Sequence, residues 1–319
     1  LQHGINLGDK SDANKKTIAD LVGDPNTFGS LHLRGPYLAK WDGKTLIRYF
    51  PQPADAIADQ LDLIPAKLDK PNGALITSSP LPQLFGLNQQ TGKPKEPLWV
   101  DENSLKDYLA GKSVKGVPAS SLFLREDRVG IGMNEKRVVD EGMLYEAEFI
   151  RPCEGVGLLV EIEGDYEADW KNGGVLLLGG EGRQAIAEVI NAAPLPKPPA
   201  SASGFKMYFA TPAYFEQGWV PATKTVNGKE QSDWSKFFKG DVTLIAAALS
   251  RYETIGGFNW ADDANGANAH RPARRFVPAG SVYYFDGPPQ FADDQHAVTD
   301  FGAQIGFGQV IITEVKNHV

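Results

Sequence analysis

Basic side chains gather at two places in this chain, and either place could bind phosphate. The first group comprises Arg125, Arg128, Lys136 and Arg137. The second and denser group is His270-Arg271-Pro-Ala-Arg274-Arg275, which follows the aromatic segment Phe258-Asn-Trp260. Guanidinium forks and ammonium groups match phosphate oxygens, and neighbouring aromatic rings suit single-stranded nucleic acid because unpaired bases stack on them. Both groups therefore indicate a surface that could hold RNA.

Each group also has a plainer interpretation. Glu126 and Asp127 lie between the first two arginines, so the first group could be a solvated hairpin whose carboxylates neutralise its cations. Exposed pairs of this kind are common and contribute little free energy. The second group could be a surface loop whose charge is offset by Asp262 and Asp263.

Three glycines near the end of the chain, Gly302, Gly306 and Gly308, precede the β-branched run Val310-Ile-Ile-Thr. Glycine has no Cβ and adopts positive φ at little cost, so this loop can lie very close to a ligand or to another chain. No Gly-Lys-Ser/Thr follows, which argues against a nucleotide phosphate loop.

A second glycine cluster, Gly179-Gly-Glu-Gly-Arg183, follows a predicted strand and precedes Ala185–Ile190, which looks helical. Consecutive N–H groups at a strand end can bind an anion, and Arg183 would add a positive charge. A tight strand-to-helix turn in which Arg183 pairs with Glu181 fits the same residues.

The chain offers little for catalysis or metal binding. No two of its five histidines have zinc-ligand spacing, and the single cysteine, Cys153, cannot complete a thiolate site. No Gly-x-Ser-x-Gly elbow occurs. We expect no catalytic residue, no metal and no cofactor. His32 is the best candidate for a general base in RNA cleavage, although a strand histidine without a catalytic role is the more ordinary case.

Strands dominate the elements that would position these residues. The hydrophobic patterns predict strands over 30–38, 43–50, 142–151, 156–163, 174–178, 205–209, 241–249 and 277–285. They predict helices over 11–23, 54–61 and 101–111, the last capped by Asp101 and ended by Gly111. Strands with few short helices between them indicate an α+β layered fold.

Composition sets the outer limits of the prediction. A chain of 319 residues favours two domains. The net charge of −8 argues against a free-standing, non-specific nucleic-acid binder, although a local basic groove fits an assembly. No apolar run is long enough to span a membrane, and one cysteine fits a reducing compartment.

Eight short segments occur in the order found in one known family. They are Leu33–Pro36, Arg128–Ile131, Glu141–Tyr145, Gly179–Arg183, Thr211–Pro221, Gly256–Phe258, Val277–Phe285 and Gly302–Gly308. Together they resemble the RAMP subunit of type III-B (Cmr) CRISPR effector complexes that holds the 5′ end of the guide RNA. The resemblance extends from about Leu31 to Val315, nearly the whole chain.

The resemblance implies two ferredoxin-like (RRM-like) domains with long insertions. They would span residues 1–140, with a helical insertion, and 141–319, which carries the glycine-rich loop. Family members open with a strand, an Arg-Asp-Gly-Arg-Pro-Phe-like segment and a helix, and nothing like these precedes Leu1. The first domain is therefore expected to lack its first strand and helix.

The resemblance also implies a non-catalytic role in a prokaryotic, cytoplasmic ribonucleoprotein of antiviral defence. Its partners would be the 5′ handle of the CRISPR RNA, the large cyclase-type subunit and a backbone RAMP subunit. The residues expected to bind RNA are Arg125, Arg128, Lys136, Arg137, Arg183, Arg271, Arg274, Arg275, Gly302, Gly306 and Gly308. Two alternatives stay open: an endoribonuclease of the same superfamily that uses His32, and a scaffold subunit without RNA contact.

Overall fold

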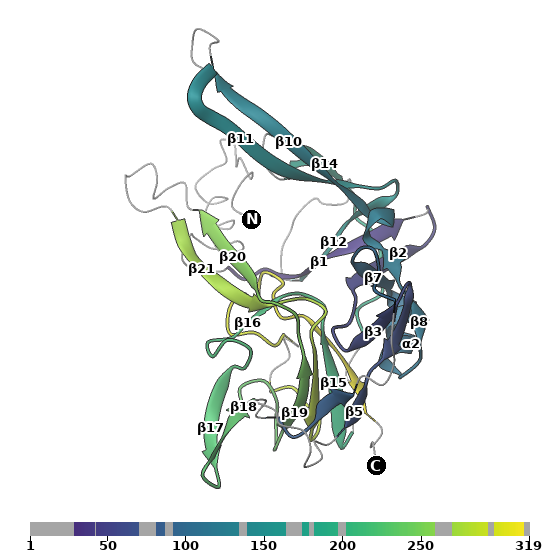
Figure 1. Ribbon diagram of the computed structural model, residues 1–319, viewed down its shortest axis with the longest axis vertical. Helices are drawn as coiled ribbons and strands as arrows, with labels where there is room; N and C mark the ends of the chain where they lie inside the picture. Colours follow the sequence, from purple (N-terminus) through teal and green to yellow (C-terminus); the bar gives the residue numbers. More distant parts are fainter. Residues whose placement is uncertain are drawn as a thin grey trace.

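The computed structural model describes residues 29–41, 43–69, 81–86, 92–133, 139–163, 174–178, 182–196, 202–258, 270–292 and 297–315. Antiparallel strands dominate these residues, in two larger sheets and several hairpins (Figure 1). Helices are few and short there, which agrees with an α+β fold. No helix in the described ranges is long and apolar enough to cross a membrane.

The first sheet has the strand order β12-β1-β2-β7-β9. Its strands are β1 (His32–Trp41), β2 (Leu46–Pro51), β7 (Leu98–Asp101), β9 (Val117–Pro118) and β12 (Val156–Glu163). The pairing of β1 with β12 shifts register between Arg34 and Tyr37. Pro36 lies in that interval, and because proline has no N–H it cannot donate to the ladder.

Helix α2 (Glu102–Leu109) begins directly after β7 and packs on this sheet. The Asp101 carboxylate accepts hydrogen bonds from the N–H groups of Asn103 and Ser104, both at 3.0 Å. Such a cap satisfies donors that the first helical turn leaves free. The predicted helix and its cap are therefore confirmed.

The second sheet has the order β19-β22-β15-β23. Its strands are β15 (Gly204–Phe209), β19 (Thr243–Ala248), β22 (Val282–Asp286) and β23 (Val310–Glu314). Every residue of β15 is buried, because the strand lies inside the sheet and is covered on both faces. Aromatic rings fill one side, where Trp234 lies edge-on to Phe285 with ring centroids 5.0 Å apart.

A common core joins the two sheets. Phe50 and Tyr108 from the first half pack in one buried cluster with Tyr208 and Tyr284 from the second. The Tyr208 hydroxyl donates to the Pro51 carbonyl at 2.6 Å. The described parts of both halves therefore form one packed body.

Two hairpins extend from this body toward the same side of the molecule (Figure 1). One consists of β10 (Phe123–Met133) and β11 (Val139–Pro152). The other consists of β20 (Glu253–Phe258) and β21 (His270–Val277), and short β16 (Ala213–Tyr214) pairs with β21 near the body.

Smaller elements complete the described fold. They are β3 (Ala56–Asp59), β4 (Asp62–Pro65), β5 (Lys67–Asp69), β6 (Leu84–Gly86), β8 (Val114–Lys115), β13 (Gly174–Leu177), β14 (Gln184–Ala187), β17 (Ala222–Val226), β18 (Lys229–Asp233) and a 3-10 turn over Ala119–Ser121.

Two predicted helices are wrong. Within 54–61 the structure has β3, which pairs with β4 across a turn where Gln60 takes a φ of 53°. Within 185–190 it has β14, which pairs with β13. In both cases an adjacent strand supplies backbone partners, and this pairing overrides the helix propensity of the alanines. The predicted helix over 11–23 lies outside the described residues.

The predicted strand over 277–285 is two strands. β21 ends at Val277 and β22 begins at Val282, with a turn between them in which Gly280 has a φ of 90°. The other predicted strands are present, with small differences at their ends.

Candidate nucleic-acid interface

The glycine loop packs against β1 of its own chain. The Leu33 N–H donates to the Gln304 carbonyl at 2.7 Å, and Leu33 forms an isolated parallel bridge with Ile305. A Cβ on Gly306 would stand 2.0 Å from the Gly35 carbonyl oxygen, and Gly306 has a φ of 95°. The close approach that the glycine spacing predicts is therefore made here by β1 of the same chain.

Most N–H groups at the turn of this loop already have acceptors. Those of Ile305 and Phe307 donate to the Gly302 carbonyl, and that of Gly306 donates to the Ala303 carbonyl, at 3.0 to 3.2 Å. The Gly308 N–H donates to the Pro212 carbonyl at 2.8 Å. The loop is thus a rigid support for neighbouring side chains, and its predicted contact with RNA stays a prediction.

Two arginines of β21 lie beside aromatic rings, and one of them, Arg274, contacts Phe301 directly before this loop. The Arg274 guanidinium is 4.2 Å from the ring centroid of Phe301 and 5.5 Å from that of Tyr214. The Arg275 guanidinium is 4.8 Å from the ring centroid of Tyr252. Cation–π contact orients a guanidinium and leaves its N–H groups available. Within the described part of the chain, neither Arg274 nor Arg275 forms an ion pair with a carboxylate.

The arginines of β10 are in a different environment. Arg125 forms an ion pair with Glu148 of β11. The Arg128 guanidinium lies 3.3 Å from the Glu126 carboxylate, which also pairs with Arg151 at 2.5 Å. A hairpin with internal ion pairs is the plainer of the two sequence interpretations. Lys136 and Arg137 lie outside the described residues.

Arg183 reaches the same hairpin from the turn before β14. Its guanidinium lies 4.3 Å from the ring centroid of Phe149, and Arg128 lies 4.9 Å from that centroid. Two cations thus flank one ring, which links β13–β14 to β10–β11. The structure brings Arg128 and Arg183 together, with Arg125 on the same hairpin beside Glu148, and places Arg274 and Arg275 on another hairpin.

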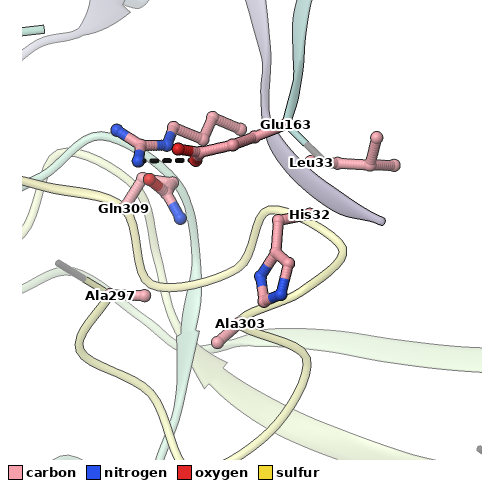
Figure 2. Close-up of a pocket in the computed structure, with 7 residues that line it drawn as sticks. His32, Leu33, Glu163, Ala297, Ala303 and Gln309 are labelled. Atoms are coloured by element: carbon pink, nitrogen blue, oxygen red, sulfur yellow. Dashed lines mark hydrogen bonds and ion pairs between the residues drawn. The ribbon is translucent and has the colours of Figure 1, made fainter. Parts of the chain in front are cut away.

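A cavity of about 300 Å³ opens where β1, β12 and the glycine loop meet (Figure 2). Its lining residues are His32, Leu33, Arg34, Glu163, Ala297, Ala303 and Gln309. The Arg34 guanidinium donates to Glu163 Oε2 at 2.8 Å, and Figure 2 shows the His32 ring beside Ala303 of the loop. The arginine therefore has a fixed position at one wall of the cavity.

Nearly the whole chain matches one protein family. The model of the CRISPR-associated protein family Cas_Cmr3 matches residues 2–315. The chain belongs to this family. The resemblance seen in the eight ordered segments is therefore confirmed, and the chain is a CRISPR-associated Cmr protein. No curated protein matches it.

Two similar solved structures are chains of type III-B Cmr-beta complexes studied by electron cryomicroscopy. The first complex is bound to cognate target RNA and AMPPnP, in state 1. The matching chain in it is 16% identical in sequence and has a TM-score of 0.44, and the match covers 88% of this protein and 72% of the matching chain. The second complex is bound to cognate target RNA. The matching chain in it is 15% identical in sequence and has a TM-score of 0.46, and the match covers 84% of this protein and 72% of the matching chain.

For this Cas_Cmr3 family member, sequence reasoning identified His32 but missed the three other polar residues that line the cavity, Arg34, Glu163 and Gln309. Gln309 is 5% exposed, and Glu163 ends the edge strand β12. The position of Gln309 between Gly308 and β23 was a usable signal, because a glycine loop and the strand after it together fix the side chain that lies between them. Glu163 could not be paired with Arg34, because 129 positions separate the two residues.

Proposed function

We propose that this chain is a non-catalytic RNA-binding subunit of a type III-B CRISPR effector complex. It holds the 5′ handle of the CRISPR RNA and bridges the large cyclase-type subunit to the backbone subunits. Membership of the Cas_Cmr3 family supports this assignment at the level of the complex. The handle contact and the bridging role follow from the family resemblance.

One observation supports the RNA contact: Arg274 and Arg275 of β21 lie on aromatic rings, and the ring that Arg274 contacts directly precedes the glycine loop. Phe301, which contacts Arg274, directly precedes Gly302. Basic groups beside aromatic rings suit an unpaired strand, in which phosphates pair and bases stack. The chain as a whole carries a net charge of −8, so the attraction to RNA is local and an assembly must support it.

The other predicted RNA-binding residues can be ranked by whether they already form ion pairs within the protein. Arg125 and Arg128 already hold carboxylates, so RNA would have to compete with Glu148 and Glu126 for them. We therefore place the main phosphate contacts at Arg274 and Arg275, with Arg125, Arg128, Arg183 and Arg271 as secondary contacts. Lys136 and Arg137 stay predictions from the sequence.

The strand order supports the ferredoxin-like fold that we propose for the second half. The four strands of the second sheet follow one another along the chain as β15, β19, β22 and β23. In the sheet their order is β19-β22-β15-β23, which is the second, third, first and fourth strand in chain order. All neighbouring pairs are antiparallel. This is the strand arrangement of a βαββαβ unit. The division at residue 140 stays a prediction, and β12, which follows it, pairs with β1.

The test uses the assembled complex with Arg271, Arg274 and Arg275 all changed to alanine. We expect weaker guide-RNA binding and a salt dependence whose slope falls by about one for each phosphate that the variant no longer binds. The matched control changes Arg125 and Arg128 to alanine and should alter both quantities less. Unchanged affinity and slope would remove the β21 arginines from the interface. Absence of crosslinks between the guide and this subunit would favour a scaffold role.

A further inference from the structure

We propose that the cavity between β1, β12 and the glycine loop binds one unpaired adenine of the guide RNA. This inference rests on the proposed RNA-binding function and specifies the base that the site reads. Two features of the fold meet at this cavity. Ala303 of the glycine loop lines it, and Phe301, whose ring Arg274 of β21 contacts, lies two positions before Ala303.

The size and walls of the cavity suit a single base. A volume of about 300 Å³ is at the small end for ligand sites, enough for a base and not for a longer segment of RNA. Leu33, Ala297 and Ala303 supply apolar surface. His32 supplies a flat aromatic ring, and histidine is one of the side chains on which splayed-out bases stack.

Gln309 is the group that would read the base edge. It is 5% exposed and lines the cavity. Its backbone groups are used in the fold, since its N–H donates to Thr211 Oγ1 at 2.9 Å and its carbonyl accepts from Ala210 at 2.8 Å. No hydrogen bond joins its side-chain carboxamide to another described residue. A polar group this buried normally has a partner, so the carboxamide is free to bind a ligand.

The hydrogen-bonding groups of the Gln309 carboxamide favour adenine over guanine. Glutamine pairs in bidentate fashion with adenine, accepting from the N6 amino group and donating to N7. Guanine presents two acceptors on the same edge, and the side chain that usually reads them is arginine. Here Arg34 is held by Glu163 at 2.8 Å. Because Arg34 is paired with Glu163, it is less available to bind guanine. The same pair places the Glu163 carboxylate in the cavity wall, where it could accept a hydrogen bond from an exocyclic amino group.

A position-by-position substitution of the guide handle tests the proposal in the assembled complex. Each unpaired nucleotide is replaced by purine riboside, which lacks the amino group, and by 7-deazaadenosine, which lacks N7. We expect one position at which either analogue weakens binding by about tenfold to a hundredfold. In Gln309→Leu the natural nucleotide should bind as weakly as the analogues, so the sensitivity at that position disappears.

The controls separate reading of the base from stability. Gln304→Leu changes a glutamine of the same loop that does not line the cavity, and it should keep the full sensitivity. If Gln309→Leu does not assemble, Gln309→Met removes the same hydrogen bonds with a more flexible side chain. His32→Ala should weaken binding of the natural handle and leave the discrimination between adenine and its analogues.

Three outcomes would overturn the assignment. They are the absence of any sensitive position, a sensitivity that Gln309→Leu leaves unchanged, and binding of free AMP to the guide-loaded complex that Gln309→Leu abolishes. The last would show a site for a free nucleotide instead of a guide base. If the guide still crosslinks to this subunit in these cases, the proposed RNA-binding function survives and only the adenine site fails.

Discussion

Gly306 lies so close to Gly35 that a methyl group in place of its hydrogen would stand 2.0 Å from the Gly35 carbonyl oxygen. The contact joins the end of the chain to the first described strand. The Thr211 hydroxyl donates to the Gly306 carbonyl at 2.7 Å and holds the loop from the other side. His32 and Arg34 flank Leu33, whose N–H donates to the Gln304 carbonyl of the same loop, so contact with the loop positions both side chains at the cavity.

Gly306→Ala should therefore displace the loop from β1. The positive φ of Gly306 alone costs a non-glycine residue about 1–3 kcal/mol, and the overlap with Gly35 adds to this because backbone cannot move aside easily. We expect a lower free energy of unfolding in urea and weaker guide binding by the assembled complex.

Gly228→Ala is the matched control for this substitution. Gly228 has a φ of 75°, yet nothing lies within 4 Å of a Cβ built on it. An alanine at this position therefore adopts the same unfavourable positive φ but does not collide with a neighbouring atom. Equal losses of stability in the two variants would show that contact with Gly35 does not matter.

The glycine spacing predicted a close approach but could not name the partner. Gly35 and Gly306 are distant in sequence, and no local pattern links them. The apolar runs of β15 and β22 could be recognised for the opposite reason. Burial of a strand on both faces leaves a continuous hydrophobic signature, so these strands could be placed from sequence alone.

Arginine pairing could not be predicted either. Arg125 and Arg275 both stand in basic, loop-flanked segments, and a count of charges treats them alike. The hairpin register brings Glu148 within reach of Arg125, whereas Arg275 lies opposite Thr254 on β20. Only cross-strand neighbours distinguish a neutralised arginine from an available one.

Asp55→Asn should strongly destabilise the fold. Lys206 Nζ lies 2.7 Å from Asp55 Oδ2, and both side chains are buried. The Tyr108 and Tyr284 hydroxyls also donate to this carboxylate, at 3.0 and 2.6 Å. Loss of the negative charge leaves the Lys206 ammonium buried without its counter-ion, which typically costs about 3–5 kcal/mol. Urea unfolding of the purified subunit or of the complex measures it.

Two further variants test this reason. Asp107→Asn breaks the exposed pair with Lys112, whose charged atoms lie 2.9 Å apart in the parent, and should change the free energy of unfolding by at most about 1 kcal/mol. Lys206→Met added to Asp55→Asn should recover part of the loss, because no buried charge then lacks a partner. No recovery would contradict the buried-charge explanation.

Alkaline pH should unfold this protein through its buried tyrosines. Burial raises the pKa of the Tyr283 hydroxyl far above its ordinary value, and burial together with the negative charge of Asp55 does the same for Tyr108 and Tyr284. Above about pH 10 the unfolded chain loses these protons while the native state keeps them. The native state then binds more protons, so the free energy of unfolding falls as pH rises.

Tyr283→Phe removes one of the buried hydroxyl groups and so measures its contribution to the loss of stability at alkaline pH. The variant loses the hydrogen bond to the Trp219 carbonyl, which is 2.7 Å in the parent, and about 1 kcal/mol of stability at neutral pH. Above pH 10 its stability should fall less steeply than that of the parent, by about 1.4 kcal/mol per pH unit. Parallel curves for the two proteins across this range would show that Tyr283 does not contribute to the alkaline loss.

His32→Ala tests whether the cavity is a site of RNA cleavage. General acid–base cleavage needs a second group to protonate the leaving oxygen. Among the described lining residues the one carboxylate is Glu163, and it pairs with Arg34. We expect neither the parent complex nor the variant to cleave precursor CRISPR RNA in a metal-free incubation, and the variant to bind the guide more weakly. Specific cleavage by the parent that His32→Ala abolishes would make this chain an endoribonuclease and assign His32 a catalytic role.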